Sequence, residues 1–538
     1  MTTSCSCADP PLRTATRRAA RVAATQTRQW LLRLALVLAG SAELGGCTAL
    51  PTRAPAPDSS HRVAEADTPL GRLAADAGIA DGRSGFRPLW LSPAALQARL
   101  DLIAAARVGL DLQTYVLADD ATGHQLMRAL REAAARGVRV RLLVDDLHTA
   151  GHSDLLLGLA AFDNVELRLY NPFPTGRDHP LARLTGLLAH FDQLNRRMHN
   201  KLFIADGRVA IVGGRNLADA YFMRSASANF VDFDLLCVGS VSAELAGHFD
   251  TFWNSRFAVP VQQLADDGLD PAQRRVRFDR LARADATPSP PALPEPVLAA
   301  IAALAGQPLV PGDAQVFFDS PDKTAGLQRS DLMLPIAGLL DRAVERVVIV
   351  TPYFLPSAQG LLRLRAARER GVEVQVVTSS LLDNDEPLVG LAYGERRREL
   401  LGTGLRLFEL SSARLERQDM LRRSLGGSMA RLHSKLGFID DRFLLVGSMN
   451  LDPRSARSNT ELALAIDSPA LTRQVLGQFQ PAGDSAVFEV RLGADGESLE
   501  WLGRDGQGAL QRADEPAPPW WRRLQLWLLY QLVPDDLP

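Results

Sequence analysis

Two stretches of this 538-residue chain are near copies of each other, and this repeat limits the possible folds more than any other feature. Residues 198–216 read MHNKLFIADGRVAIVGGRN, and residues 432–450 read LHSKLGFIDDRFLLVGSMN. His199 and His433 lie 234 positions apart (433 − 199), and the same spacing separates the lysine, aspartate and asparagine of the two copies. A constant spacing over so long a span indicates a duplicated domain.

A pattern of strand, helix and strand precedes each copy. The helical segments end in glycine, and the flanking segments are short, apolar and rich in β-branched residues. This order predicts a βαβ unit with a parallel sheet in each part of the chain, and hence an α/β fold. The three segments cover residues 107–117, 123–137 and 138–146 in the first part and 345–355, 360–371 and 372–380 in the second.

The histidine and lysine of each copy stand two positions apart in a chain where lysine is rare. Of the 60 Lys and Arg residues, only Lys201, Lys323 and Lys435 are lysines. Because side chains i and i+2 of a strand face the same way, each His–Lys pair is expected on one surface. Random placement would give on the order of 0.05 such pairs, so two pairs favour a functional site over satisfied core histidines.

Both copies match the HxKxxxxD motif of the phospholipase D superfamily, including the trailing glycine, glycine or serine, and asparagine. A double motif is more specific than a single one. The segments LQTYVLADDATG, YNPF, GGRNLADAYF, TPYFLPS and NLDPRSARSNTE resemble the bacterial cardiolipin synthase C type, from about residue 75 onward. The resemblance implies a duplicated fold, with two α/β/α sandwich halves, mixed sheets and one active site at their interface.

The resemblance also implies roles for the motif residues. His199 would attack the phosphorus of a phosphodiester and form a phosphohistidine, while His433 would protonate the leaving alcohol; the near symmetry of the copies also allows the reverse assignment. Lys201 and Lys435 would stabilise the negative charge on the phosphate oxygens, with no metal or other cofactor. Hydrogen bonds to the phosphate are expected from Asn216, Ser448 and Asn450.

Further polar and aromatic residues are candidates for supporting roles. Asp234 and Glu461, on the strand after each motif, are expected to hold the histidine rings. Asp206 and Asp440 belong to the catalytic motif, but Asp is favoured in turns, so we expect them mainly to support the hairpin turns. The carboxyl ends of parallel strands form ligand sites, so a possible pocket is expected at Tyr115 and Tyr353. Lys323 is either part of that pocket or an exposed surface residue.

The N-terminus has the pattern of a secretory signal. Five arginines between positions 13 and 28 precede an apolar run that ends in LGGC at Cys47. This end resembles the lipobox of bacterial lipoproteins, so residues 1–46 are expected to be a signal peptide and Cys47 a lipidated anchor in the inner or outer membrane of a bacterial envelope. An uncleaved hydrophobic anchor and a misassigned start are the alternatives.

Composition divides the rest of the chain. Residues 47–74 are rich in Pro, Ala and polar residues and are expected to form a tether. The C-terminal extension at 491–538 contains PPWWRRLQLWLLYQLVP, whose Trp and Arg residues suit a membrane interface, or alternatively a helix packed on the core. Between them we expect a first phospholipase D-like half at 75–280, a linker at 281–313 and a second half at 314–490.

Three features favour a phospholipid substrate and a membrane surface over nucleic acid. They are the expected lipid anchor, the aromatic C-terminal segment, and a net charge that falls from −2 to −6 when residues 1–46, with six Arg, one Asp and one Glu, are removed. We expect a phosphatidyltransferase that makes cardiolipin by transfer to phosphatidylglycerol. A hydrolytic phospholipase D that releases phosphatidic acid and an inactive lipid-binding envelope protein are the alternatives, and a nuclease is less favoured.

Overall fold

The computed structural model describes residues 56–530, with gaps at 78, 80–81, 174–176, 179–182, 184–190, 284–305, 413–427, 480–485, 505–508, 514 and 517–519. The predicted signal peptide and Cys47 lie outside the described residues. Among the helices described, none is both long and apolar enough to cross a membrane.

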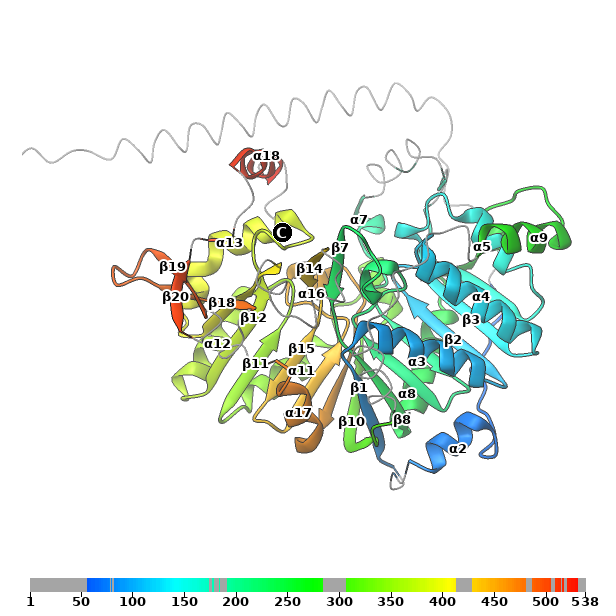
Figure 1. Cartoon of the computed structure of the whole chain (residues 1–538), viewed down its shortest axis with the longest axis horizontal. Helices are drawn as coiled ribbons and strands as arrows, with labels where there is room; N and C mark the ends of the chain where they lie inside the picture. The colour runs from blue at the N-terminus through cyan, green and yellow to red at the C-terminus, as the bar shows by residue number, and fades with distance from the viewer. Residues whose placement is uncertain are drawn as a thin grey trace, which may run out of the picture. The chain divides into compact units, whose positions relative to one another are not determined.

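The expected α/β fold of two similar halves is confirmed (Figure 1). In the first half, the βαβ unit runs from β2 (Gly109–Thr114) through α4 (Ala121–Ala135) to β3 (Arg139–Asp145). Its other strands are β1 (Ser84–Leu89), β4 (Val165–Tyr170), β5 (Leu202–Ala205), β6 (Val209–Gly213), β7 (Ala228–Val231), β8 (Asp234–Gly239) and β9 (Ala258–Pro260). Its other helices are α2 (Pro69–Ala75), α3 (Ser92–Ala105), α5 (Ser153–Leu159), α7 (Phe191–Leu194), α8 (Ser240–Trp253) and α9 (Pro271–Leu281).

The second half repeats this order. Its βαβ unit runs from β11 (Arg346–Val350) through α12 (Ala358–Glu369) to β12 (Glu373–Ser379). The remaining strands are β10 (Val310–Phe318), β13 (Arg406–Leu410), β14 (Met429–Leu432), β15 (Leu436–Ile439), β16 (Phe443–Gly447), β17 (Leu462–Asp467), β18 (Val487–Leu492), β19 (Leu499–Arg504) and β20 (Leu510–Ala513). The remaining helices are α11 (Met333–Asp341), α13 (Pro387–Leu401), α16 (Pro453–Arg457), α17 (Pro469–Leu476) and α18 (Trp520–Tyr530).

Apart from β7 and β14, which form a two-stranded sheet of their own, the described strands of the two halves join into one sheet through β1 and β10, which pair antiparallel. On one side of this junction the order is β8, β6, β5, β2, β3, β4, β9, and on the other it is β17, β16, β15, β11, β12, β13, β18, followed by β19 and β20. Parallel pairing is confined to β2–β3–β4 and β11–β12–β13 within this sheet. The strand order is therefore the same in both halves when each is counted outward from the junction.

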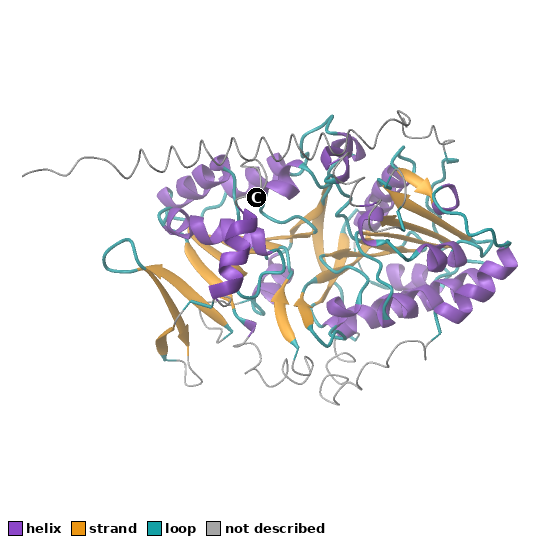
Figure 2. Cartoon of the chain, turned by 90° about the horizontal axis from the view of Figure 1, so that it is seen from above, coloured by secondary structure: helices purple, strands orange, loops and turns teal. Residues whose placement is uncertain are grey.

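Helices cover both faces of this sheet (Figure 2). Helices α8 and α17 pack on one face around the junction, in an apolar core that contains side chains of both halves. On the opposite face, α3, α4, α5 and α9 cover the first half, while α12 and α13 cover the second. The shared core ties the halves together, so residues at the ends of their strands are held in fixed positions relative to one another.

The motif hairpins β5–β6 and β15–β16 turn through residues with positive φ, namely Asp206 and Gly207 in one and Asp440 and Asp441 in the other. The Asp206 carboxylate accepts hydrogen bonds from three successive backbone N–H groups, at Arg107–Gly109. Asp440 does the same at Val344–Arg346. Seven residues of extended chain place Asp206 about 20 Å from His199. The hydrogen bonds of the motif aspartates therefore support the two turns, as expected from the preference of Asp for turns.

The segment from residue 56 onward, predicted to be part of a tether, packs against the first half in the structure. The carbonyls of Pro57 and Ser59 accept hydrogen bonds from Arg168 and Arg141 of the first half, at 2.8 and 2.9 Å. Ala64 is 1% exposed. Strands also cross two predicted boundaries, because β10 starts inside the expected linker and β18 to β20 extend the second half beyond residue 490. Composition missed this packing because arginines on the sheet satisfy the carbonyls of a polar segment.

Candidate active site

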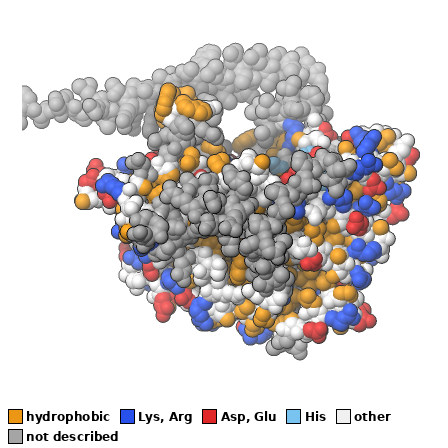
Figure 3. All heavy atoms as spheres, viewed as in Figure 1, with side chains coloured by type: hydrophobic (Ala, Val, Ile, Leu, Met, Phe, Trp, Pro, Cys, Tyr) orange, Lys and Arg blue, Asp and Glu red, His pale blue; other side chains and the backbone are white. Residues whose placement is uncertain are grey.

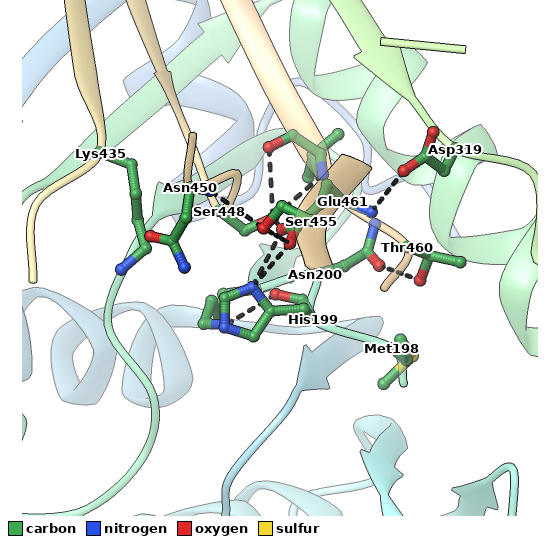
Figure 4. A network of polar contacts seen from close by, with 12 residues as sticks. Met198, His199, Asn200, Asp319, Lys435, Ser448, Asn450, Ser455, Thr460 and Glu461 are labelled. Atoms are coloured by element: carbon green, nitrogen blue, oxygen red, sulfur yellow. Dashed lines mark hydrogen bonds and ion pairs between the residues drawn. The ribbon is translucent and has the colours of Figure 1, made fainter. Parts of the chain in front are cut away.

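His199 lies just before β5, and its ring contacts a carboxylate of the other half. Its Nδ1 lies 3.1 and 3.0 Å from the two carboxylate oxygens of Glu461, a residue 262 positions later (Figure 4). Glu461 is completely buried. The hydroxyls of Ser448 and Ser455 donate to the same carboxylate at 2.5 and 2.8 Å. With these partners, Glu461 has a fixed orientation and holds the His199 ring in place.

His433 has an equivalent partner, but it is not the predicted one. Its Nδ1 lies 2.6 Å from Oδ2 of Asp232, while Asp234 forms ion pairs with Arg99 and Arg215. The strand register explains the correction. Gly213 of the first motif pairs with Asp234, and the equivalent glycine of the second motif pairs with a residue two positions after Glu461. The counterpart of Glu461 is therefore Asp232, two positions before Asp234.

The backbone fixes both crossed contacts. The N–H of His199 donates to the carbonyl of Thr460 at 3.0 Å, and the N–H of His433 donates to the carbonyl of Val231 at 2.9 Å. Thr460 and Val231 directly precede the two carboxylate residues. Beside His433 this contact continues a short parallel ladder between β7 and β14, which belong to different halves. Backbone hydrogen bonds alone thus align each histidine with the segment that carries its carboxylate.

One position of the repeated motif differs between the halves for a steric reason. A Cβ on Gly214 would lie 2.1 Å from Oδ1 of Asp232, so a side chain has no room there. The equivalent Ser448 carries a hydroxyl that binds Glu461. The variable glycine or serine of the motif therefore adapts each half to its own carboxylate.

Both motif lysines are buried beside their histidines. The ammonium group of Lys201 donates to the carbonyl of His199 at 2.6 Å, and that of Lys435 donates to the carbonyl of His433 at 2.5 Å. Nζ of Lys435 also lies 3.0 Å from Nδ1 of His433. Burial lowers the pKa of Lys201 well below its usual range, and the charge of Lys435 contributes in the same direction. The two pairs therefore share one electrostatic environment, although they come from different halves.

The pKa shifts leave the rings neutral at pH 7. Burial lowers the pKa of His199 to about 4, against the opposing effect of Glu461, and lowers the pKa of His433 well below its usual range. Burial alone would raise the pKa of Glu461, but its interactions with His199 and Lys201 and the Ser448 hydrogen bond hold that pKa below its usual value. Burial raises the pKa of Asp232. The pKa values of the two carboxylates are therefore shifted in opposite directions.

The three residues predicted to bind phosphate differ in their hydrogen-bond partners. The Asn216 amide donates to the hydroxyl of Tyr221 at 2.7 Å and accepts from the backbone N–H of Val116, so one of its N–H groups and its oxygen have partners within the protein. Ser448 is bonded to Glu461. Asn450 has a buried Oδ1 with no hydrogen-bond partner among the described residues, and Figure 4 shows its amide directed toward Lys435 and His199. Of the three, Asn450 is the group oriented toward the two His–Lys pairs.

Comparison with known proteins identifies the family. Residues 100–253 and 336–482, together more than half of the chain, match a family described as cardiolipin synthase, PLD-like domain. The chain belongs to this family of the phospholipase D superfamily. The two matched stretches coincide with the two halves of the fold, so the resemblance inferred from the repeated motif is confirmed.

Individual relatives of this family cover most of the chain. It is 34% identical over 458 residues to cardiolipin synthase C of Escherichia coli, which spans 83% of this chain and 94% of the relative. It is 28% identical over 369 residues to cardiolipin synthase B of Salmonella typhimurium, which spans 69% of this chain and 73% of that one. The crystal structure of phosphatidylserine synthase from Haemophilus influenzae has a TM-score of 0.51 at 16% identity, covering 76% of this chain and 89% of that chain, and it shows the common fold.

The two tyrosines predicted for the pocket lie in related places of this phospholipase D-like fold. The Tyr115 ring packs edge-on against the rings of His199 and His148, with centroids 5.1 and 4.9 Å apart. The Tyr353 hydroxyl donates to Oδ1 of Asp385 at 2.8 Å. Tyr115 therefore restricts the position of the His199 ring, whereas Tyr353 is held by a carboxylate of its own half.

Lys323 is not on the surface, so the interpretation as an exposed residue was wrong. It is completely buried, and its ammonium group donates to Oδ2 of Asp319 at 2.7 Å and to the carbonyl of Ser455 at 2.8 Å. The same Asp319 oxygen accepts the backbone N–H of Glu461 at 3.1 Å. Lys323 and Asp319 thus form a buried ion pair behind Glu461 and fix the position of its backbone.

Several site residues escaped the sequence analysis. Asp232 carries no motif signal of its own, and Ser455 lies in the segment NLDPRSARSNTE, where the sequence does not distinguish it from its neighbours. His433 is also flanked by the rings of Tyr221 and Phe230, each 5.0 Å away between centroids. Within the described part of the chain, no cluster of three or more His, Cys, Asp or Glu side chains has a geometry that could hold a metal ion.

Proposed function

We propose that this protein is a phosphatidyltransferase that makes cardiolipin by transferring a phosphatidyl group to phosphatidylglycerol. The observation that carries the proposal is the pair of crossed contacts, His199 with Glu461 and His433 with Asp232, which give two imidazoles with oriented protons in one site. A phosphodiester exchange needs two such groups, one to attack phosphorus and one to move the proton of the alcohol. The relationship to cardiolipin synthases C and B supports the choice of lipid.

In the proposed reaction, the free ring nitrogen of His199 attacks the phosphorus of the donor phospholipid and forms a phosphohistidine. The bond between phosphorus and the head-group oxygen breaks, and His433 donates the proton that this oxygen needs to leave as an alcohol. The neutral His433 then takes the proton from a hydroxyl of phosphatidylglycerol. That oxygen attacks the phosphohistidine, which releases cardiolipin and restores both histidines.

The free rings are neutral, whereas the proposed acid must carry a proton. The negative charge of a bound phosphodiester raises the pKa of His433, so this ring can carry the proton that the acid needs. The Glu461 carboxylate, whose pKa is held below its usual value, stabilises positive charge on His199 during attack, which supports His199 as the nucleophile. Lys201 and Lys435, with the amide of Asn450, are the proposed partners of the phosphate oxygens.

A bilayer substrate requires the protein to reach a membrane surface, and α18 has a suitable face. Trp520, Leu524 and Trp527 follow the i, i+4, i+7 spacing of one helix face and are 76, 50 and 51% exposed. Figure 3 shows apolar atoms on the surface of α18, and this helix lies beside α13 (Figure 1) and contacts it. We propose that this face enters the membrane interface, where aromatic rings are favoured. The lipidated Cys47 remains a second proposed attachment to the envelope.

Product analysis tests the proposed function. Purified full-length protein is incubated with vesicles of phosphatidylglycerol, and the lipids are identified by mass spectrometry. We expect cardiolipin and free glycerol from the unaltered protein and neither from His199→Ala or His433→Ala. His152→Ala, which changes a histidine outside the site, serves as the matched control and should keep full activity. Phosphatidic acid alone would indicate the hydrolase, and no turnover of any phospholipid would indicate a lipid-binding protein without activity.

A further inference from the structure

An apolar cavity of about 200 Å³ lies in the second half, against the strands that carry the second motif. Helices α11 and α12 form one side of it, and β11, β15 and β16 form the other. Its apolar lining includes Leu334, Ala337, Ile349, Ile439, Leu445 and Met449. Among the described lining residues, two are charged, and one of them, Arg363, is paired with Asp341. The other is Lys435 of the candidate active site.

Lys435 connects the cavity to the proposed chemistry. Lys435, Gly437 and Ile439 alternate on the same face of the chain at β15, and all three line the cavity. The stem of Lys435 therefore borders the apolar space, while its ammonium group lies 3.0 Å from Nδ1 of His433. A molecule that occupied this space would have an apolar part among the aliphatic side chains and an anionic part at Lys435.

Helix α11 covers the cavity without being buried itself. Its sequence is MLPIAGLLD, yet none of its nine described residues is buried, and Leu334 is 74% exposed although it lines the cavity. A helix that is apolar on all sides is normally enclosed by protein or lipid. No side chain caps the N-terminus of α11 either. The helix is thus a partly exposed apolar cover of the cavity.

We propose that this cavity binds part of one acyl chain of a phospholipid and so places the lipid phosphate between the two His–Lys pairs. The inference rests on the proposed function and extends it by naming where the chain of the substrate lies. Pockets that enclose a whole small molecule usually measure roughly 300–1,000 Å³, so the present volume fits a segment of one chain rather than a complete lipid. The continuity of apolar lining with Lys435 selects an amphiphile with an anionic head over a purely apolar ligand.

Binding of alkyl phosphates tests this inference without requiring turnover. Each methylene removed from water strengthens binding by about fourfold, so affinity should rise steeply from ethyl to octyl phosphate, measured by calorimetry below the micelle concentration. Ala337→Phe fills the cavity from α11 and should leave the affinity for ethyl phosphate unchanged while weakening octyl phosphate at least tenfold. Leu362→Phe adds the same ring on α12 at a position that is 62% exposed and outside the lining, and it should bind as the unaltered protein does.

Smaller changes and a kinetic measurement keep the test decisive. Ala337→Leu should give an intermediate loss for octyl phosphate if Ala337→Phe does not fold. With soluble short-chain phosphatidylglycerols, filling the cavity should raise KM for the longer chains more than for the shortest. Equal chain-length dependence in the filled and unaltered proteins would overturn the inference. Chain-dependent binding of alkyl phosphates that is lost on filling, together with no turnover, would support the cavity and overturn the proposed function alone.

Discussion

His199 and Glu461 are 262 positions apart, yet the imidazole Nδ1 of one lies 3.0 Å from the carboxylate of the other. Asp232 and His433 repeat this contact in the opposite direction, so each half supplies the histidine of one pair and the carboxylate of the other. Neither half contains both the histidine and the carboxylate of one such contact. The site therefore forms only when the halves pack together across β1 and β10, and its geometry depends on the shared core.

The neighbouring aspartates of the first half should respond in opposite ways to removal of their charge. Asp232→Asn should lower kcat by about 10²- to 10⁴-fold with the fold retained, because His433 loses the partner that fixes its tautomer. Asp234→Asn should cost about 3–5 kcal/mol of stability, because it leaves Arg99 and Arg215 without their buried partner. Thermal unfolding and kcat are measured for both. A large loss of kcat in Asp234→Asn at unchanged melting temperature would contradict the register argument.

The assignment of nucleophile and acid predicts a dependence on the leaving group. The p-nitrophenolate group of a p-nitrophenyl phosphodiester leaves phosphorus without taking up a proton. His433→Ala should therefore still release a rapid burst of p-nitrophenol, whereas His199→Ala should release none. Both variants should fail on a phospholipid. Stopped-flow absorbance measures the burst. The opposite pattern, with a burst in His199→Ala, would reverse the two roles.

The buried His199 predicts a loss of stability in acid. Its pKa is about 4 in the folded chain, against about 6.5 when unfolded, so the unfolded chain binds the proton first as the pH falls. The resulting loss of folding stability is absent above about pH 6.5 and grows as the pH falls toward 4. Replacement by Asn removes it, so the stability lost between pH 7 and pH 4.5 should shrink by about 2 kcal/mol in urea denaturation. An unchanged loss would show that the folded ring takes up its proton at an ordinary pH.

The motif aspartates predict a stability effect separate from catalysis. Asp206→Asn removes a carboxylate that accepts three backbone hydrogen bonds. It should lower the free energy of unfolding by about 1–3 kcal/mol and change kcat of the folded enzyme by less than about threefold. Asp440→Asn should behave alike in the second half. Denaturant melts and initial rates are compared for each. A loss of kcat similar to that of His199→Ala would place these aspartates in the chemistry after all.

The exposed face of α18 predicts its membrane role. Replacing Trp520 and Trp527 together by Ser should weaken binding to phosphatidylglycerol vesicles about tenfold or more, since two aromatic rings lose their burial. Activity on soluble short-chain substrate should be unaffected. Leu510→Ser, at another exposed apolar residue on β20, is the matched control and should leave vesicle binding unchanged in a sedimentation assay. If the unaltered protein and both variants bind vesicles equally, α18 packs on α13 and does not bind the membrane.

The sequence by itself determined the duplication, the βαβ units and the two His–Lys pairs, because repeat spacing and strand alternation are local properties of the chain. It pointed to Asp234 instead of Asp232, since residues two apart on an extended chain face the same way and the loops that follow the two motifs differ in length. Only the hydrogen-bond register of β6 with β8 decided for Asp232. The buried ion pair of Lys323 and the crossing of the carboxylates likewise required the tertiary structure, because each depends on contacts between segments distant in sequence.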